Sequence, residues 1–296
     1  MARMAGTASL AEALLDVAVV STTPVAGGDI CTTTRLRLTD GRSAAIKTRP
    51  QAPADFFPTE ATGLRRLRDA ATQHGGAPAP EVLAVNEECI VVSWVEPVKP
   101  TIEAAEEFGR ALAATHAAGA DEFGAPHDGW IGLAPLPNRP LPTWEEFYAS
   151  RRVMPYVRAA RDRGALTAAE AATIEQAMKQ IHRFCADPEP PALLHGDLWS
   201  GNLVWSAEGV HLIDPAVHGG HRETDLAMLS LFGAPHLQRI VDAYREAAPL
   251  AEGWADRQPL HQLHPLLVHA VLFGGAYGAR AAAAARQLLD GTTVGP

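Results

Sequence analysis

The feature that most constrains this chain is a set of two acids and one amide at fixed spacing. Asp197 and Asn202 lie five residues apart in the run HGDLWSGN at 195–202, and Asp214 follows twelve residues later. A carboxylate can accept a proton from an alcohol, and Mg²⁺ prefers carboxylate and amide oxygens as ligands. We therefore assign Asp197 as a catalytic base and Asn202 and Asp214 as ligands of Mg²⁺. Together they suit phosphoryl transfer from a nucleotide.

Protein kinases carry these three roles in the pattern H-R-D-x-x-x-x-N followed by D-F-G. Here Gly196 stands in place of the arginine, and Pro215-Ala216 stands in place of Phe-Gly. These departures favour a kinase of small molecules over a protein kinase. Any one Asp or Asn could equally serve a turn or a helix cap, so the interpretation depends on the whole set.

A hairpin is expected between the amide and the second acid. Apolar segments at 203–205 and 210–213 flank the run SAEG at 206–209, which is typical of a turn. Such a hairpin would return the chain so that Asp214 faces the loop that carries Asp197.

The N-terminal third offers the other parts of an ATP site. Gly27 and Gly28 lie between strand-like runs, where they could let the backbone approach phosphate or could form an ordinary hairpin turn. Lys47 lies near the end of the strand-like run Ser43–Thr48, as in the V-A-I-K motif. Glu60, thirteen residues further on, could pair with Lys47 or stabilise a helix N-terminus.

A proline-interrupted segment at 96–100 follows the expected strands. We interpret it as the hinge between a nucleotide-binding lobe at 1–95 and a helical lobe at 96–296 that carries the catalytic and substrate site. Adenine would bind the Trp94 carbonyl and the Glu96 amide at this hinge. The expected fold class is α+β, a protein-kinase-like fold of two lobes with a small antiparallel sheet in the first.

The second lobe is expected to be mainly helical. The proline- and glycine-rich segment 126–142 reads as a long loop at the rim of the substrate site, because such loops in compact domains are often functional. Helical patterns are found at 101–118, 143–163, 167–185, 223–232, 236–246 and 259–289.

Composition excludes several classes of protein. The length of 296 residues can hold two lobes, and a hydrophobic content of 47% excludes a mostly disordered chain. A net charge of −9 argues against a nucleic-acid partner. The three cysteines, Cys31, Cys89 and Cys185, are widely spaced, which suits a reducing compartment. Acidic residues interrupt the apolar stretch within 1–21, so we expect a cytoplasmic protein with no membrane segment.

The chain resembles the fructosamine kinase (ketosamine-3-kinase) family, within the superfamily of aminoglycoside phosphotransferases and choline kinases. The superfamily is indicated by H-G-D…N…D. The family is indicated by Trp199, by the run DPAVHGGHRETDLAM at 214–228 and by LFGGAY at 272–277. The resemblance implies phosphorylation of a sugar hydroxyl of ketosamines with ATP and Mg²⁺, and a role in protein deglycation or repair.

The resemblance also suggests roles for five neighbouring residues. Trp199 could stack on a sugar or could fill the core, and His218 and Glu223 lie in a run expected to contact substrate. Asp225 resembles the acid that holds the catalytic loop in this family. His195 would support the metal site through a backbone hydrogen bond, with a general-base role as the alternative.

Two positions depart from the family pattern. An aromatic residue usually precedes Gly-His-Arg-Glu, whereas this chain has His218-Gly219 there. Members also often carry a phosphate-loop cysteine that can link two subunits; Cys31 lies close to that place but could equally be a small buried strand residue. The chain is accordingly expected to be a monomer or a homodimer.

Two alternatives remain open at this stage. One is a phosphotransferase acting on another small alcohol, such as an aminoglycoside or choline, because the catalytic set is shared. The other is a catalytically silent nucleotide-binding protein. The presence of Lys47, Asp197, Asn202 and Asp214 together argues against the silent alternative.

Overall fold

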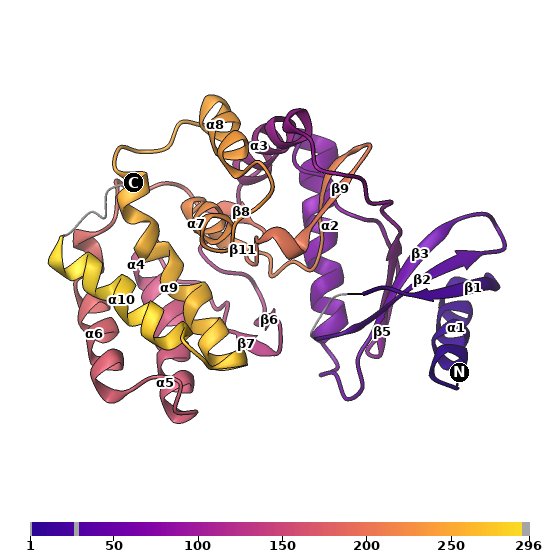
Figure 1. Ribbon diagram of the computed structural model, residues 1–296, viewed down its shortest axis with the longest axis horizontal. Helices are drawn as coiled ribbons and strands as arrows, with labels where there is room; N and C mark the ends of the chain where they lie inside the picture. The colour runs from indigo at the N-terminus through magenta and orange to yellow at the C-terminus, as the bar shows by residue number, and fades with distance from the viewer. Residues whose placement is uncertain (1, 27–29, 292–296) are drawn as a thin grey trace.

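The chain forms a sheet-rich N-terminal part and a larger helical part that lie side by side (Figure 1). The structure is a computed structural model, and it describes residues 2–26 and 30–291. An antiparallel sheet with the strand order β1-β2-β3-β5-β4 forms the N-terminal part together with two helices. The bounds are α1 Ala2–Leu15, β1 Val19–Pro24, β2 Thr32–Leu38, β3 Ser43–Thr48, α2 Phe56–His74, β4 Val82–Val85 and β5 Cys89–Ser93.

Both faces of the sheet are covered, which explains why its central strands are apolar at successive positions. Ile46 and Val91 pack in one cluster with α1, whereas Ala45, Ile90 and Val92 pack in a second cluster with α2. Helix α1 was not expected from the sequence. The second cluster continues into the helical part, so the two parts share a core.

The helical part holds the predicted hairpin, which is confirmed as β9 and β10. Its described helices are α3 Ile102–Ala117, α4 Trp144–Phe147, the π-helical η1 Tyr148–Val153, α5 Met154–Asp162, α6 Ala168–Lys179, α7 Glu223–Phe232, α8 Leu237–Ala247, α9 Trp254–Phe273 and α10 Tyr277–Asp290. Its strands pair as β6 Gly129–Ile131 with β7 Ala134–Leu136, β8 Ala192–Leu194 with β11 His218–Gly220, and β9 Leu203–Ser206 with β10 Gly209–Leu212.

Three predicted elements differ from the structure. The single helix expected at 259–289 is two helices, because Gly274 and Gly275 take positive φ values of 67° and 63° between α9 and α10. The loop expected at 126–142 contains the β6–β7 hairpin. The helix expected at 167–185 ends at Lys179 and continues only as a short 3₁₀ turn.

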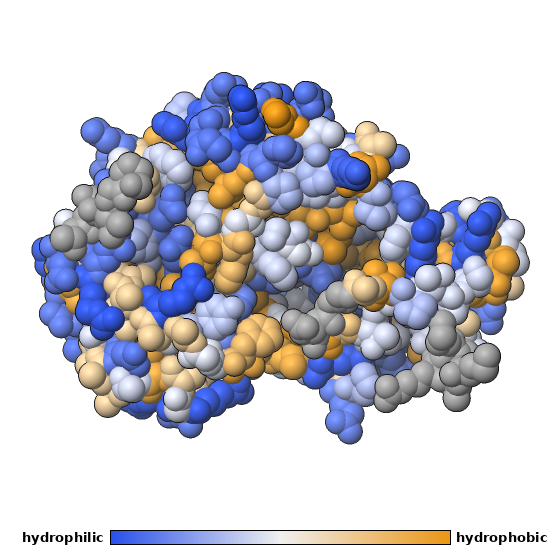
Figure 2. Space-filling view, viewed as in Figure 1, coloured by the Kyte–Doolittle hydropathy of each residue, from blue (hydrophilic) through white to orange (hydrophobic). Residues whose placement is uncertain are grey.

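The described part of the chain has no helix that combines the length and apolar character needed to cross a bilayer. Figure 2 shows polar side chains over most of one face, with apolar ones lining the hollow between the two parts.

Helices α3 and α8 approach each other closely at Gly109. A Cβ added at Gly109 would overlap the carbonyl oxygen of Ile240 and would lie 3.0 Å from the amide nitrogen of Tyr244. Backbone atoms cannot rotate away as a side chain does. A glycine at this position therefore sets the distance between the two helices.

We predict that Gly109→Ala lowers the free energy of unfolding by about 1–3 kcal/mol, because overpacking pushes α3 from α8 and outweighs the better helix propensity of alanine. Urea denaturation would measure it. The matched control is Gly6→Ala in α1, where no atom lies within 4 Å of the new Cβ and stability should hold or rise slightly. Equal behaviour of the two variants would contradict the close-packing argument.

Candidate active site

The loop after β8 carries the HGDLWSGN run and is shaped by a glycine. Gly196 has a φ of 83°, and a Cβ at this position would overlap the carbonyl oxygen of Ala216. The amide of Ala216 donates to the carbonyl of His195 over 2.8 Å. Residue 196 thus needs glycine both for its backbone conformation and for this close approach.

Asp225, at the start of α7, anchors this loop from below. Its carboxylate accepts the backbone N–H groups of His195 at 2.7 Å and Gly196 at 3.0 Å. His116 of α3 contacts the same carboxylate at 3.2 Å and contacts the Tyr244 hydroxyl of α8 at 2.8 Å. Burial by itself would raise the pKa of Asp225, but the bonds from His116 and the loop outweigh it and lower that pKa.

The His195 side chain forms hydrogen bonds with backbone groups of the catalytic loop and of Ile213. Its Nε2–H donates to the carbonyl of Ile213 at 2.9 Å, and its Nδ1 accepts the amide of Asp197 at 3.2 Å. Burial lowers its pKa, so the ring is neutral at pH 7. Both nitrogens therefore have protein partners, an arrangement that suits support of the loop better than general-base chemistry.

Asp197 and Asn202 are joined directly. The Asn202 side-chain amide donates to the backbone carbonyl of Asp197 at 2.8 Å and to its carboxylate at 3.0 Å. Burial raises the pKa of Asp197 to about 7, with the Asn202 bond opposing the rise and the charge of Asp214 adding to it. Because the amide nitrogen of Asn202 is engaged, its oxygen is the atom suited to a metal.

Lys47 joins three elements of the site. Its ammonium lies 2.7 Å from the Glu60 carboxylate in α2 and 2.8 Å from the Asp214 carboxylate after β10. The predicted pair with Glu60 is present, and Glu60 lies beyond the first turn of α2, which begins at Phe56. Burial would lower the pKa of Lys47, but Asp214 and Glu60 outweigh it and raise that pKa.

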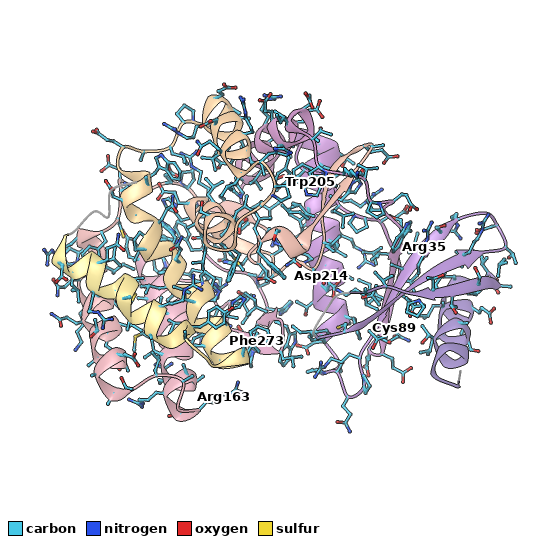
Figure 3. The ribbon with its side chains drawn as sticks, in the orientation of Figure 1. Arg35, Cys89, Arg163, Trp205, Asp214 and Phe273 are labelled. Carbon is cyan, nitrogen blue, oxygen red and sulfur yellow. The ribbon has the colours of Figure 1, made fainter. Side chains whose placement is uncertain are left out.

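Asp214 contacts Lys47 from a left-handed backbone conformation. It has a positive φ of 54°, and the preceding Ile213 amide donates to the carbonyl of Asn202 at 3.1 Å. Its side chain is 43% exposed, the most open of the three charged groups. Figure 3 places Asp214 between the two parts of the molecule. An oxygen of this carboxylate could therefore face a bound nucleotide.

The remaining nucleotide-site residues are only partly described. Gly27 and Gly28 lie outside the described residues. The Trp94 amide donates to Ser43, and its indole N–H donates to the Glu96 carboxylate at 2.9 Å. Arg35 binds Glu96 at 2.7 Å and lies over the Trp94 ring, 4.6 Å from its centroid. These contacts fix the connecting segment, whereas the predicted adenine contacts stay a prediction.

Trp199 lies in the open. Its ring is packed over Gly201 and lies 6.3 Å from the Phe232 ring, and the residue is 37% exposed. Filling of the core, the alternative considered from the sequence, does not describe this position.

His218 and Glu223 are both buried, and the His218 ring lies against the catalytic loop, where a Cβ added at Gly196 would be 3.0 Å from its Nδ1. His218 is 2% exposed, its Nδ1–H donates to the carbonyl of Ala216, and its Nε2 accepts from Arg152 at 3.3 Å. The Glu223 carboxylate is bound by Arg257 at 2.6 Å and by His261 at 3.3 Å. Both side chains are thus engaged with protein partners, and the substrate roles that the motif suggests for them stay predictions.

Arg152 holds the segment 126–142 in place, although no sequence motif points to it. Arg152 is almost fully buried in η1 and donates to Pro137 and Asn138, which fixes the segment 126–142. An adjacent pair of arginines does not reveal which one turns inward. Cys31 is a free thiol, and burial raises its pKa to about 11, which disfavours the reactive thiolate.

The fold defines the general class of protein. A macrolide 2′-phosphotransferase from Brachybacterium faecium shares it with a TM-score of 0.59 and 16% identity, with 97% of this chain and 98% of that chain covered. The sheet-rich and helical parts thus form a protein-kinase-like fold.

The family follows from closer comparisons. Residues 4–291 match the sequence model of the family described as fructosamine kinase. A protein of Enterococcus faecium assigned as a ketoamine kinase is 33% identical over 266 residues, 87% of this chain and 91% of that protein. A structure from Thermobifida fusca assigned as a fructosamine-3-kinase has 47% identity and a TM-score of 0.90, covering 96% and 98% of the two chains. The chain belongs to the fructosamine kinase family and is a phosphotransferase.

We predict that Asp225→Ala lowers the free energy of unfolding by about 3 kcal/mol or more, because it leaves two loop amides and His116 buried without their acceptor. Asp225→Asn should recover part of this loss, since its oxygen can still accept one bond. Asp121→Ala, at an exposed acid, is the control and should change little. A loss below about 1 kcal/mol on urea denaturation would show that Asp225 does not hold the loop.

Proposed function

We propose that this protein is an ATP-dependent kinase of ketosamines that phosphorylates a hydroxyl of the sugar. The observation that carries the proposal is the pairing of Lys47 with both Glu60 and Asp214 beside the bonded pair Asp197–Asn202, in a chain of the fructosamine kinase family. The relatives support the substrate class, and the contacts of Lys47, Asp197, Asn202 and Asp214 support the roles proposed for these four residues.

The donor set of the site fits a magnesium nucleotide. Two oxygen donors, the Asn202 amide oxygen and the Asp214 carboxylate, come from neighbouring segments, and oxygen is the ligand type that Mg²⁺ prefers. Lys47 is held by carboxylates as a point charge suited to the α- and β-phosphates. Bound Mg²⁺ and ATP would supply the phosphoryl group and neutralise its developing charge.

Asp197 is the group we assign to proton transfer. The Asn202 amide donates to one carboxylate oxygen of Asp197, Oδ2. The other carboxylate oxygen could then accept the proton of a sugar hydroxyl. Its pKa of about 7 is close to the operating range of a general base. Trp199, two residues away and partly exposed, would provide an aromatic face for the sugar.

The remaining expectations form part of the same proposal. Residues 1–95 would act as the nucleotide-binding lobe and residues 96–296 as the lobe for catalysis and substrate, with Trp94 and Glu96 offering backbone groups to adenine. Gly27 and Gly28 would lie at the phosphates. The three cysteines are free thiols, which supports a reducing, cytoplasmic location.

A substrate panel tests the function. Purified protein would be assayed for ATP consumption with fructosyl and ribulosyl amines, kanamycin and choline, and we expect turnover of the ketosamines. Turnover of kanamycin or choline with none of the ketosamines would refute the substrate class but not the phosphotransferase.

In the same assay, Asp197→Ala should lower kcat by about 10²–10⁴-fold, because the general base is lost, with little change in the melting temperature. A kcat close to that of the unchanged protein would contradict the role of Asp197.

The metal assignment can be tested by binding alone. Asp214→Ala should weaken binding of a non-hydrolysable ATP analogue by tenfold or more with Mg²⁺ present and far less in its absence, because a ligand of the metal is removed. Isothermal titration calorimetry with and without Mg²⁺ measures both. Equal losses under the two conditions would point to loss of the Lys47 pair instead of loss of a metal ligand.

A further inference from the structure

A continuous series of rings begins at the catalytic loop. Phe232 follows Trp199 at a centroid distance of 6.3 Å, and His269 lies against Phe232 at 4.6 Å with an interplanar angle of 33°. The rings of Phe273 and Tyr277 lie 5.5 Å and 5.0 Å from His269. We name these five side chains the aromatic ledge.

The aromatic ledge points toward the sheet-rich part. Phe273 ends α9 on the side of the helical part that faces the sheet-rich part (Figure 3). A Cβ at Gly132, in the β6–β7 hairpin, would lie 2.8 Å from Ile30 and 3.0 Å from Leu272, so this end of α9 and the segment before β2 meet at one hairpin. The aromatic ledge thus runs from beside the catalytic loop toward the nucleotide side.

The two ends of the aromatic ledge, Trp199 and Phe273, expose apolar ring surface to solvent. Phe273 is 52% exposed and Trp199 is 37% exposed, both among the most open large apolar residues of the described chain. Contiguous exposed aromatic surface marks a binding site more often than isolated exposed residues do. Nothing in the phosphoryl transfer itself requires Phe232, His269 or Phe273.

The aromatic ledge is apolar, and the one charged group described against its rings is a cation, the Arg280 guanidinium at 5.7 Å from the centroid of Tyr277. The sequence has no Asp or Glu from 226 to 241 or from 257 to 289, the segments that supply every ring except Trp199. The His269 Nδ1–H donates to the carbonyl of Pro265, and burial lowers the pKa of this ring, so it is neutral at pH 7. A ligand with several ammonium groups would find no carboxylate on these segments.

We propose that the aromatic ledge binds the amine substituent of the ketosamine, and that the substrates of this enzyme carry an aromatic or other apolar group on that amine. The inference rests on the proposed function. With the reacting hydroxyl at Asp197 and the sugar on Trp199, the substituent at the far end of the sugar meets the rings that follow. Apolar burial and ring stacking would favour such a group over a small or cationic one.

The test compares two ketosamines with the same sugar, the fructosyl adducts of benzylamine and of methylamine. We expect kcat/KM for the benzylamine adduct to exceed that for the methylamine adduct by about tenfold, which corresponds to about 1.4 kcal/mol. Phe273→Ala should reduce this ratio several-fold, and Phe273→Leu should retain part of it. Val20→Ala, at an exposed apolar residue of β1, is the matched control and should leave the ratio unchanged.

Different outcomes test the aromatic ledge and the ketosamine kinase function separately. Turnover of both adducts with a ratio near one, or a ratio that Phe273→Ala does not reduce, would overturn the aromatic ledge as the amine subsite and leave the ketosamine kinase intact. Turnover of neither adduct, with kanamycin or choline accepted, would overturn the proposed function and this inference together.

Discussion

The buried ammonium of Lys47 is the interaction on which the rest of the site depends. A charge removed from water costs several kcal/mol unless oppositely charged groups meet it with good geometry. Here Glu60 of α2 and Asp214 after β10 both lie within 2.8 Å. The ion pairs therefore join the sheet and the helix behind it to the end of the catalytic hairpin, which lies 167 residues further along the chain than Lys47. A shift of any one element would leave a charge buried without its partner.

Asp225 plays the corresponding part inside the helical portion. It ties two loop amides to His116 of α3, and His116 in turn contacts Tyr244 of α8. The close approach of those two helices at Gly109 holds this chain of contacts at its far end. The packing of α3 against α8 therefore helps to fix the position of the catalytic loop. A general base must be held near its productive position to act. A loop anchored only to solvent could not do this.

The parts of the site that could be predicted are those in which chemistry fixes the spacing. Lys47, Glu60, Asp197, Asn202 and Asp214 were found because their roles demand particular residue types at particular intervals, and the hairpin before Asp214 followed from its turn sequence. His218 and Glu223 were read from motif membership, which does not tell whether a side chain points to substrate or into the core. Their burial depends on tertiary packing, as does the inward orientation of the Arg152 side chain. The helix break at Gly274 was missed because the alanine-rich segment 281–285 after it favours a continuous helix.

Selectivity and catalysis reside in different elements of this fold. In the proposed function, Lys47, Asp197, Asn202 and Asp214 would act on a phosphate and a hydroxyl. Because many kinase substrates contain these two groups, the four residues carry no information about the molecule that bears the hydroxyl. The residues Phe232, His269 and Phe273 of the aromatic ledge would contact neither group, and they can vary without harm to the ion pairs of Lys47. The ring contacts of Phe232, His269 and Phe273 are separate from the ion pairs of Lys47, so each set can change with little effect on the other. A likeness in the catalytic set therefore identifies the reaction, and the substrate must be sought in the rings beside it.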